Sequence, residues 1–213
     1  LTKTNDGLGK LTLVGNTVAD LAVVITTNGS PTVGGDAVTG GIVRTLDASA
    51  VTGALTKSGA GSLLLTGANT YTGTTTISAG TLIVERDALT YTSSSYTGAG
   101  TLWVRSAASS FASAHTFSAP ISNLGSLIVG QTTNTTAVTL PNAITLTGSL
   151  LVYGPTTLGG NITTASTQEY TGNVTISATS ASLSTTNSSM TFGGNINGTT
   201  ANANSLYLST GSG

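Results

Sequence analysis

The stretch "SGAGSLLLTGANTYTGTTTISAGTLIV" (residues 58–84) contains one short phrase twice. The run GSLLL (61–65) returns nineteen positions later as GTLIV (80–84), again with a glycine, a small hydroxyl residue and three apolar residues. Such runs are too short for helices, and the Gly, Asn and Thr residues between them are typical of turns. The stretch therefore predicts short β-strands that are joined by turns and that recur along the chain.

The phrase recurs well beyond this stretch. Copies follow one another at intervals of 19, 20, 25 and 23 residues and begin at Gly61, Gly80, Gly100, Gly125 and Gly148. Weaker copies begin at Gly9 and Gly172. The copy at Gly172 also matches a second phrase, Tyr-Thr-Gly before a Thr-rich strand, so the alignment of the last third of the chain with the repeat stays open. Such periods indicate a solenoid, since a propeller blade needs about 40 to 45 residues. We predict an all-β parallel β-helix (solenoid) of about nine coils that forms a single module over residues 1–213.

A stacked β-helix places equivalent residues of successive coils above one another, and residues two positions apart share a face. This predicts two buried ladders, one of Leu63, Leu82, Leu102, Leu127 and Leu150 and one of Leu65, Val84, Val104, Val129 and Val152. Each fully buried aliphatic side chain stabilises the fold by about 1.5–3 kcal/mol. The two ladders are therefore expected to form the core.

A third apolar ladder lies between these two in the sequence. Its members are Leu64, Ile83, Trp103, Ile128 and Leu151, with Tyr207 farther along. Strand alternation points these side chains outward, where a lone solvated rod would carry polar residues. Two interpretations stay open: a loop or neighbouring strand covers this ladder, or it is a lateral contact stripe for a partner.

Composition limits the function classes. Charged residues make up 6% of the chain, against about 25% in ordinary soluble domains, while 38% of residues are hydrophobic. Six Lys and Arg residues are too few for a nucleic-acid surface, and the absence of Cys excludes disulfides and thiolate chemistry. The longest aliphatic run, 21–25, is too short to span a membrane, and no signal peptide is visible. Because the chain opens inside a repeat-like phrase, we expect a fragment or processed piece of a longer exported protein.

Candidate chemical residues are few and scattered. The one histidine, His115, is expected to be a partly exposed loop or strand residue, because one imidazole cannot build a multi-His metal site. A β-helix enzyme acting on polysaccharides would need clustered carboxylates, and the candidates are Asp20, Asp36, Asp47, Glu85 and Asp87. Glu85 and Arg105 follow equivalent valines, which predicts a surface ion pair on neighbouring coils. We predict no catalytic residue, no bound metal and no cofactor.

The stretch "LTKSGAGSLLLTGANTYTGTTTISAGTLIV" (55–84) resembles the passenger-associated β-strand repeat of bacterial autotransporters. The shared positions are Leu55, Thr56, Lys57, Gly59, Gly61, Leu63, Leu65, Gly67, Asn69, Tyr71, Thr72, Gly73, Ala79, Gly80, Thr81 and Leu82. A partial copy opens the chain with Leu1-Thr2-Lys3, Gly7, Gly9, Leu11 and Leu13, and residues 157–198 resemble the filamentous-haemagglutinin-type exoproteins. Both resemblances imply a right-handed parallel β-helix outside a Gram-negative cell, and neither fixes an activity.

These observations predict a structural or adhesive module of a secreted surface protein: an adhesin, an autotransporter passenger or a filament subunit. Self-association, end to end or lateral, is expected, together with an unidentified host, cell-surface or glycan receptor. One alternative is binding to ice or a crystal surface, suggested by Thr74-Thr75-Thr76 and Thr145-Leu146-Thr147, although Thr-x-Thr does not recur in register. The other alternative is an enzyme that acts on polysaccharides, against which the scarcity of acid and base residues argues.

Overall fold

The structure, a computed structural model, describes residues 3–4, 12–13, 22–26, 32–34, 43–47, 54–58, 60–66, 73–85 and 95–211. Every regular element in these ranges is a β-strand, and every strand pairing between them is parallel. By its contacts the chain divides into two compact units. Unit 1 comprises 1–103 and 119–124, and unit 2 comprises 104–118 and 125–213. Each unit is a stack of β-solenoid turns, which confirms the prediction of a parallel β-helix.

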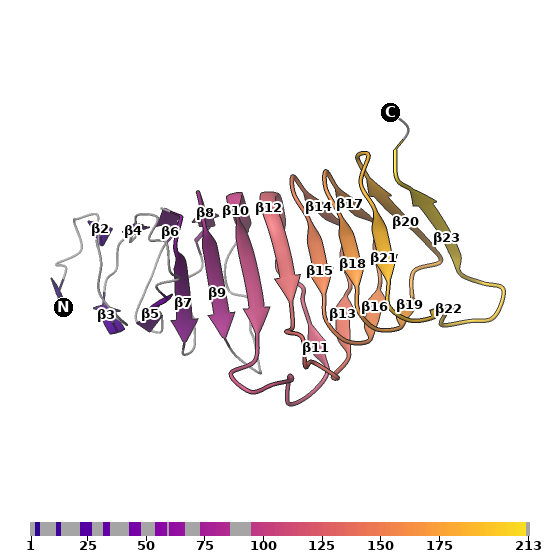
Figure 1. The fold of residues 1–213 in the computed structure, drawn as a ribbon, viewed down its shortest axis with the longest axis horizontal. Coiled ribbons are helices and arrows are strands. Elements are labelled where there is room, and N and C mark those ends of the chain that lie inside the picture. The colour runs from indigo at the N-terminus through magenta and orange to yellow at the C-terminus, as the bar shows by residue number, and fades with distance from the viewer. Residues whose placement is uncertain are drawn as a thin grey trace. The chain divides into compact units, whose positions relative to one another are not determined.

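Unit 1 contains two parallel stacks of strands. The first stack comprises β1 (Lys3–Thr4), β3 (Ala22–Thr26), β5 (Val43–Asp47), β7 (Ser62–Thr66) and β9 (Thr81–Glu85). The second comprises β2 (Thr12–Leu13), β4 (Thr32–Gly34), β6 (Leu55–Ser58), β8 (Thr75–Ile77) and β10 (Tyr96–Arg105). Figure 1 shows β7 and β9 side by side. β10 and a further strand, β12 (Ile121–Val129), contribute residues to both units.

The two predicted core ladders are buried as expected. In unit 1, Leu63 pairs with Leu82 and Leu65 with Val84, and none of the four side chains is more than 2% exposed. These four residues occupy every second position of β7 and β9, so apolar side chains from successive turns meet inside the solenoid. In unit 2, Leu127 pairs with Leu150 and Val129 with Val152, and all four side chains are buried.

The repeated glycine of the phrase has a steric cause. Gly80 adopts φ +66°, and a Cβ atom there would lie 2.3 Å from the carbonyl oxygen of Gly61 on the preceding turn. Gly148 repeats the close approach in unit 2, where a Cβ atom would lie 2.7 Å from the carbonyl oxygen of Gly125. Only glycine avoids this backbone contact, and only glycine readily adopts the positive φ of Gly80.

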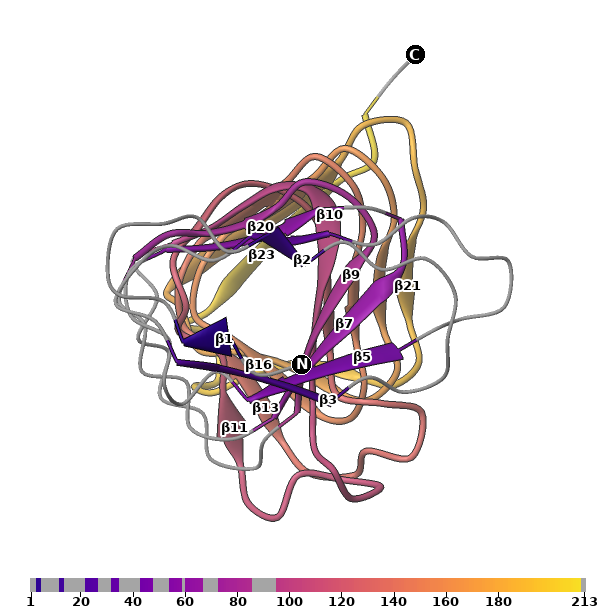
Figure 2. The same ribbon diagram turned by 90° about the vertical axis from the view of Figure 1, so that its left-hand side faces the viewer.

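Unit 2 has three stacks, one on each side of a triangular turn. The first comprises β11 (His115–Thr116), β13 (Val138–Leu140), β16 (Thr156–Leu158), β19 (Val174–Ile176) and β22 (Ile196–Gly198). The second comprises β14 (Ile144–Leu146), β17 (Ile162–Thr164), β20 (Ser180–Thr185) and β23 (Ser205–Ser209). The third comprises β12, β15 (Leu150–Val152), β18 (Gln168–Tyr170) and β21 (Met190–Phe192). Figure 2 shows strands of the first stack, of the second and of the third on different sides of the turn.

A strict six-residue period underlies these three sides. From Val138 to Ile176 a three-residue strand begins every six residues, and its first and third residues are buried. Three such strands complete a turn, so Val138 lies beside Thr156, and Thr156 beside Val174. The sequence prediction followed the longer spacing of the glycine phrase and missed this six-residue period. The period is visible in the successive six-residue segments, or hexads, of residues 138–167: VTLPNA, ITLTGS, LLVYGP, TTLGGN and ITTAST.

The structure settles the register of the last third. The run after Gly172 forms β19, which pairs with β16 and β22 and lies outside the ladder of Leu150. That ladder continues instead through Gln168 and Met190. The segment after Gly172 is therefore not equivalent to the other copies of the phrase. It is one of the six-residue segments, which resembles the phrase in sequence but lies on a different side of the turn.

The partial copy at the start of the chain is also not equivalent to residues 55–84. Lys3 pairs with Ile25 in the stack of β9, whereas Lys57 shares a register with Val33 and Leu13 in the other stack. The weak copy at Gly9 is misplaced for the same reason. As with the segment after Gly172, the sequences at the start of the chain match the repeat, but their strands lie on a different side of the turn.

One buried polar side chain links three successive turns of unit 2. Asn134 is 6% exposed, and its Oδ1 accepts from the Ser110 hydroxyl (2.8 Å) and the Phe111 amide (3.1 Å). Its Nδ2 donates to the carbonyl oxygens of Thr136 (2.9 Å) and Tyr153 (2.7 Å). The side chain thus uses both donors and accepts twice, which compensates the desolvation of the buried amide.

Candidate functional surfaces

Unit 1 carries a register of threonines. Thr12, Thr32, Thr56, Thr76 and Thr97 occupy the same position on five successive described strands. The side chains of the last three are half-buried, and the residues on either side of Thr56 and Thr76 are buried. Thr56, Thr76 and Thr97 therefore lie on the outer face, about 4.8 Å apart along the stack.

Unit 2 carries two further registers of this kind, which we call hydroxyl ladders. The first runs through Thr116, Thr139, Thr157 and Thr175 to Asn197 on the stack from β11 to β22. The second runs through Thr145, Thr163, Ser184 and Ser209 on the stack from β14 to β23. In the second ladder the Ser184 hydroxyl lies 3.1 Å from that of Thr163.

The sequence prediction missed these ladders because it looked for Thr-x-Thr within one strand. A three-residue strand has one outward position, so each turn supplies a single threonine per side. The signal was present in the spacing, since the second position of five six-residue segments is threonine: Thr139, Thr145, Thr157, Thr163 and Thr175. The two segments that form the third side carry Leu151 and Glu169 at this position. The resulting faces offer hydroxyl groups and methyl groups at regular intervals and no ionisable chemistry.

The five side chains of the predicted contact stripe are less exposed than outward positions of a solvated strand would be. Leu64 pairs with Ile83 in unit 1 and Ile128 with Leu151 in unit 2. Ile83 is buried at 4% exposure, and Leu64, Trp103, Ile128 and Leu151 are half-buried. The same register continues through Glu169 and Thr191, so it becomes polar toward the later turns of unit 2.

Tyr207 does not extend this stripe. It lies on β23 beside Ser182 of β20, on a different side of the turn, and it is 65% exposed. Its placement in the stripe was wrong, because the turns after Ile176 no longer keep the six-residue spacing. Its neighbour Leu208 faces the same way as the buried Leu183 and is 45% exposed.

His115 occupies an inward position. It begins β11, pairs with the buried Val138 and is 3% exposed. Its ring stacks on Phe111, with 4.2 Å between ring centroids and 9° between ring planes. The expectation of a partly exposed histidine was wrong, since the alternation that buries Val138 also turns His115 into the core.

The candidate carboxylates are not brought together where the structure describes them. Glu85 is half-buried at the end of β9, and Asp47 is described only by its backbone in β5. Asp20, Asp36 and Asp87 lie outside the described residues. Within the described ranges there is no group of three His, Cys, Asp or Glu residues that could hold a metal ion. The predicted Glu85–Arg105 pair joins residues of different units and stays a prediction.

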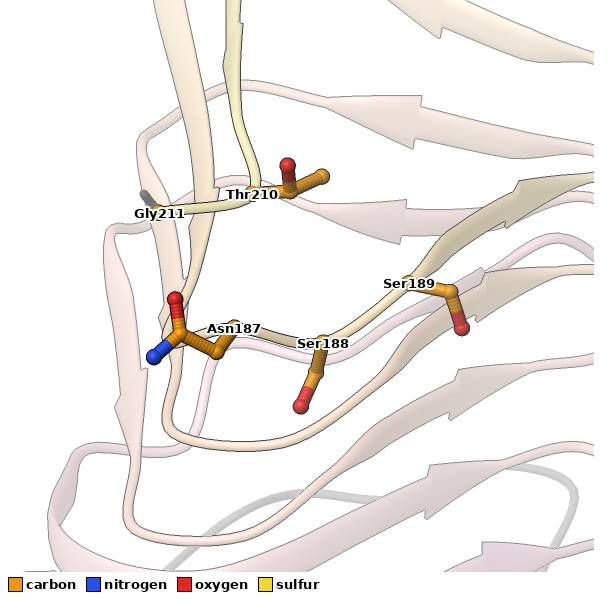
Figure 3. Close-up of a pocket in the computed structure, with 5 residues that line it drawn as sticks. All are labelled: Asn187, Ser188, Ser189, Thr210 and Gly211. Atoms are coloured by element: carbon orange, nitrogen blue, oxygen red, sulfur yellow. The ribbon is translucent and has the colours of Figure 1, made fainter. Parts of the chain in front are cut away.

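A shallow depression of about 340 Å³ lies in unit 2. Its lining consists of Asn187, Ser188, Ser189, Thr210 and Gly211. Figure 3 shows that these side chains point in different directions and do not converge on a common centre. The depression contains no charged group and no candidate nucleophile–base pair, so its chemistry is limited to neutral hydrogen bonding.

No helix long and apolar enough for a membrane span occurs in the part of the chain that the structure describes. The comparison with curated proteins gives no match, and neither does the comparison with solved structures. Residues 55–84 match the family model of the passenger-associated-transport-repeat. This match confirms the resemblance drawn from the sequence and coincides with β6, β7, β8 and β9. The chain thus carries a passenger-associated-transport-repeat, whose halves β6–β7 and β8–β9 stack on each other as successive turns of the β-solenoid.

Proposed function

We propose that this chain is a structural and adhesive segment of a secreted autotransporter passenger on the surface of a Gram-negative bacterium. The passenger repeat at 55–84 carries the proposal. The architecture of unit 2 supports it further, since its strands, like those of the repeat, stack in parallel. A parallel solenoid of this kind presents each outer face as a regular surface.

The outer faces of unit 2 support adhesion through neutral contacts. After Arg105 the sequence contains one acidic residue, Glu169, and no Lys or Arg. A partner would therefore meet hydroxyl groups, methyl groups and half-buried aliphatic side chains, each of which contributes little alone. Because neutral contacts are not screened by salt, we expect adhesion by unit 2 to vary little with ionic strength.

The proposal is tested in two steps. The chain is fused to an autotransporter translocator, and intact cells are probed with protease and with an antibody against the chain. Beads that carry the purified chain are then incubated with epithelial cells and with immobilised glycans at about 50 and 500 mM salt, bracketing strong and weak screening. Beads that carry Leu82→Asp, a core variant expected to unfold, serve as the control. Failure of export, or equal binding by both kinds of bead, would contradict the proposal.

Binding to ice or another crystalline surface is a second candidate. The observation that favours it is the strict register of the hydroxyl ladders, because a lattice is recognised by regularly spaced groups on a rigid face. Each ladder is a single row, and the rows of Thr139 and Thr145 lie on different sides of the turn. Thermal hysteresis that disappears in Thr157→Lys and persists in Glu169→Lys would support this function. Absence of hysteresis in the unaltered chain would exclude it.

A further inference from the structure

The segment 106–118, which we call the strap, leaves the end of β10, passes through β11 and leads back toward β12 (Figure 1). Most of its side chains are exposed. Side chains of the next turn bind its backbone: the hydroxyl of Thr133 donates to the Ser109 carbonyl oxygen, and that of Thr136 to the Phe111 carbonyl oxygen, both at 2.6 Å. The strap is therefore a surface segment of unit 2 that is held in part by neutral side-chain hydrogen bonds.

Three aromatic rings of the strap point into unit 2. The side chains of Phe111, His115 and Phe117 are exposed by 3% or less, and the first two rings are stacked. The backbone fixes these rings in place, since the amides of His115 and Phe117 donate to the carbonyl oxygens of Ala137 and Thr139, both at 2.9 Å. With these hydrogen bonds formed, the imidazole lies inside the unit.

The imidazole of His115 lies in a neutral part of the chain. Residues 106–168 contain no Asp, Glu, Lys or Arg, so the described elements beside it, which are β13 and the rest of the strap, carry no charged side chain. Their other titratable group is the phenol of Tyr153, which is neutral in acid. Arg105 borders the strap and is itself a cation, and Glu169 lies on β18 in another stack. Burial in such surroundings disfavours the charged form of an imidazole.

We propose that the strap is acid-sensitive: protonation of His115 releases residues 106–118 from unit 2, while the turns from β13 to β23 stay folded. The closed strap favours the neutral ring, whereas an opened strap lets water solvate the imidazolium. An exposed imidazole titrates near pH 6.5. The closed strap therefore has its full stability above about pH 6.5 and loses it as the pH falls below that value. Opening exposes Phe111 and Phe117, which creates an apolar patch in acid only.

This inference goes beyond the proposed adhesive function and is tested by amide hydrogen exchange of the whole chain, measured by NMR at pH 7.5 and 4.5. Exchange rates are divided by the intrinsic rate at each pH. Protection of the amides of Phe111 and Phe117 should fall by tenfold to about a hundredfold, because opening takes up one proton. The amide of Thr156 donates to the Asn173 carbonyl oxygen in the later turns and should change by less than twofold.

Two variants identify the group that responds to acid. His115→Phe keeps an aromatic ring beside Phe111 but cannot ionise, so protection of the strap should agree within twofold at the two pH values. His115→Gln serves the same purpose if His115→Phe does not fold. Glu169→Gln removes the one carboxylate after Arg105 and should keep the pH dependence of the unaltered chain. Fluorescence of a dye that binds apolar surface should rise at pH 4.5 in the unaltered chain and in Glu169→Gln, and stay low in His115→Phe.

Three outcomes overturn the proposal. The first is strap protection that does not change with pH, or that changes equally in His115→Phe. The second is an equal loss of protection at Thr156, which would mean that unit 2 unfolds as a whole. The third is a rise in strap protection in acid, which would mean that a carboxylate stabilises the imidazolium. The adhesion assay is read at pH 7.5, where the strap is closed, so that either proposal can fail alone.

Discussion

The ammonium nitrogen of Lys57 lies 3.1 Å from the backbone carbonyl oxygen of Ala79, although Lys57 occupies an inward position of β6 and is 3% exposed. Lys57 pairs with Ile77 of β8, so its aliphatic stem lies among core residues while the ammonium group reaches the corner after the next strand. The lysine of the passenger repeat therefore has a structural explanation: it donates to the carbonyl oxygen of Ala79 at a corner between two strands.

Replacement of this lysine separates packing from hydrogen bonding. Lys57→Met retains most of the stem and should lower the free energy of unfolding by about 1–2 kcal/mol, because the carbonyl of Ala79 loses a charged donor. Lys57→Ala also removes the stem and should cost about 2–4 kcal/mol. Urea unfolding measures both, with the outward neighbour Thr56→Ser as the control. Equal stability of Lys57→Met and the unaltered chain would contradict this role for the ammonium group.

A charge should destabilise the fold far more at an inward position than at an outward position of the same strand. Leu127 is fully buried, whereas its neighbour Ile128 faces outward and is half-buried. Leu127→Asp should cost about 4 kcal/mol or more and melt unit 2, because an unpaired carboxylate would enter the core. Ile128→Asp should cost about 1 kcal/mol or less. Thermal unfolding by circular dichroism compares the two, and a larger effect for Ile128→Asp would reverse the assignment of faces.

Leu82→Asp is the corresponding test in unit 1. Leu82 is fully buried beside Leu63, so its replacement should destabilise the solenoid as strongly as Leu127→Asp does. Thr76→Asp, on the outer face of β8, is the matched control and should cost about 1 kcal/mol or less. A melting temperature that is unchanged in Leu82→Asp would be incompatible with the core described here.

The ladders of Leu63 and Leu65 could be predicted from sequence because a parallel stack repeats the same side chains at the same register. The hydroxyl ladders and the three-sided turn were missed because the glycine phrase marks one corner per turn, whereas the hexads mark all three. The burial of His115 was not predicted, because a single polar residue outside the repeated phrase does not show in the sequence whether it points inward or outward. The bonds of Asn134 join residues from three turns, which no local pattern identifies.

Asn134 should be far more important for stability than the exposed corner asparagines. Its amide makes four hydrogen bonds to three turns, whereas the exposed Asn173 accepts one, from the Asn195 amide at 2.9 Å. Asn134→Ala leaves buried backbone groups without partners and should cost about 2–4 kcal/mol. Asn173→Ala should cost about 1 kcal/mol or less. Hydrogen exchange at the Phe111 amide measures the local effect, and protection that survives Asn134→Ala would argue against this role of the Asn134 side chain.

Unit 2 should lose stability at high pH through Tyr170. This side chain is fully buried; its hydroxyl donates to Gln168 Oε1 at 3.1 Å, and its ring stacks on Phe192 at 5.4 Å between centroids. Burial raises the pKa of the Tyr170 hydroxyl above the value of about 10 that holds in an unfolded chain. The folded protein keeps this proton at pH values where the unfolded chain releases it. The resulting stability is complete below pH 10 and is lost as the pH rises above 10, by up to about 1.4 kcal/mol per pH unit.

Tyr170→Phe tests this dependence directly. The variant cannot ionise at this position, so the fall in its urea midpoint between pH 9.5 and 11 should be shallower than that of the unaltered chain. At pH 7 it should be less stable by about 1 kcal/mol, because Gln168 Oε1 loses its donor while the ring stacking on Phe192 remains. Tyr207→Phe, at an exposed position of β23, should keep the unaltered slope. Identical slopes in Tyr170→Phe and the unaltered chain would show that another group governs alkaline unfolding and that the Tyr170 hydroxyl reaches solvent before unit 2 unfolds.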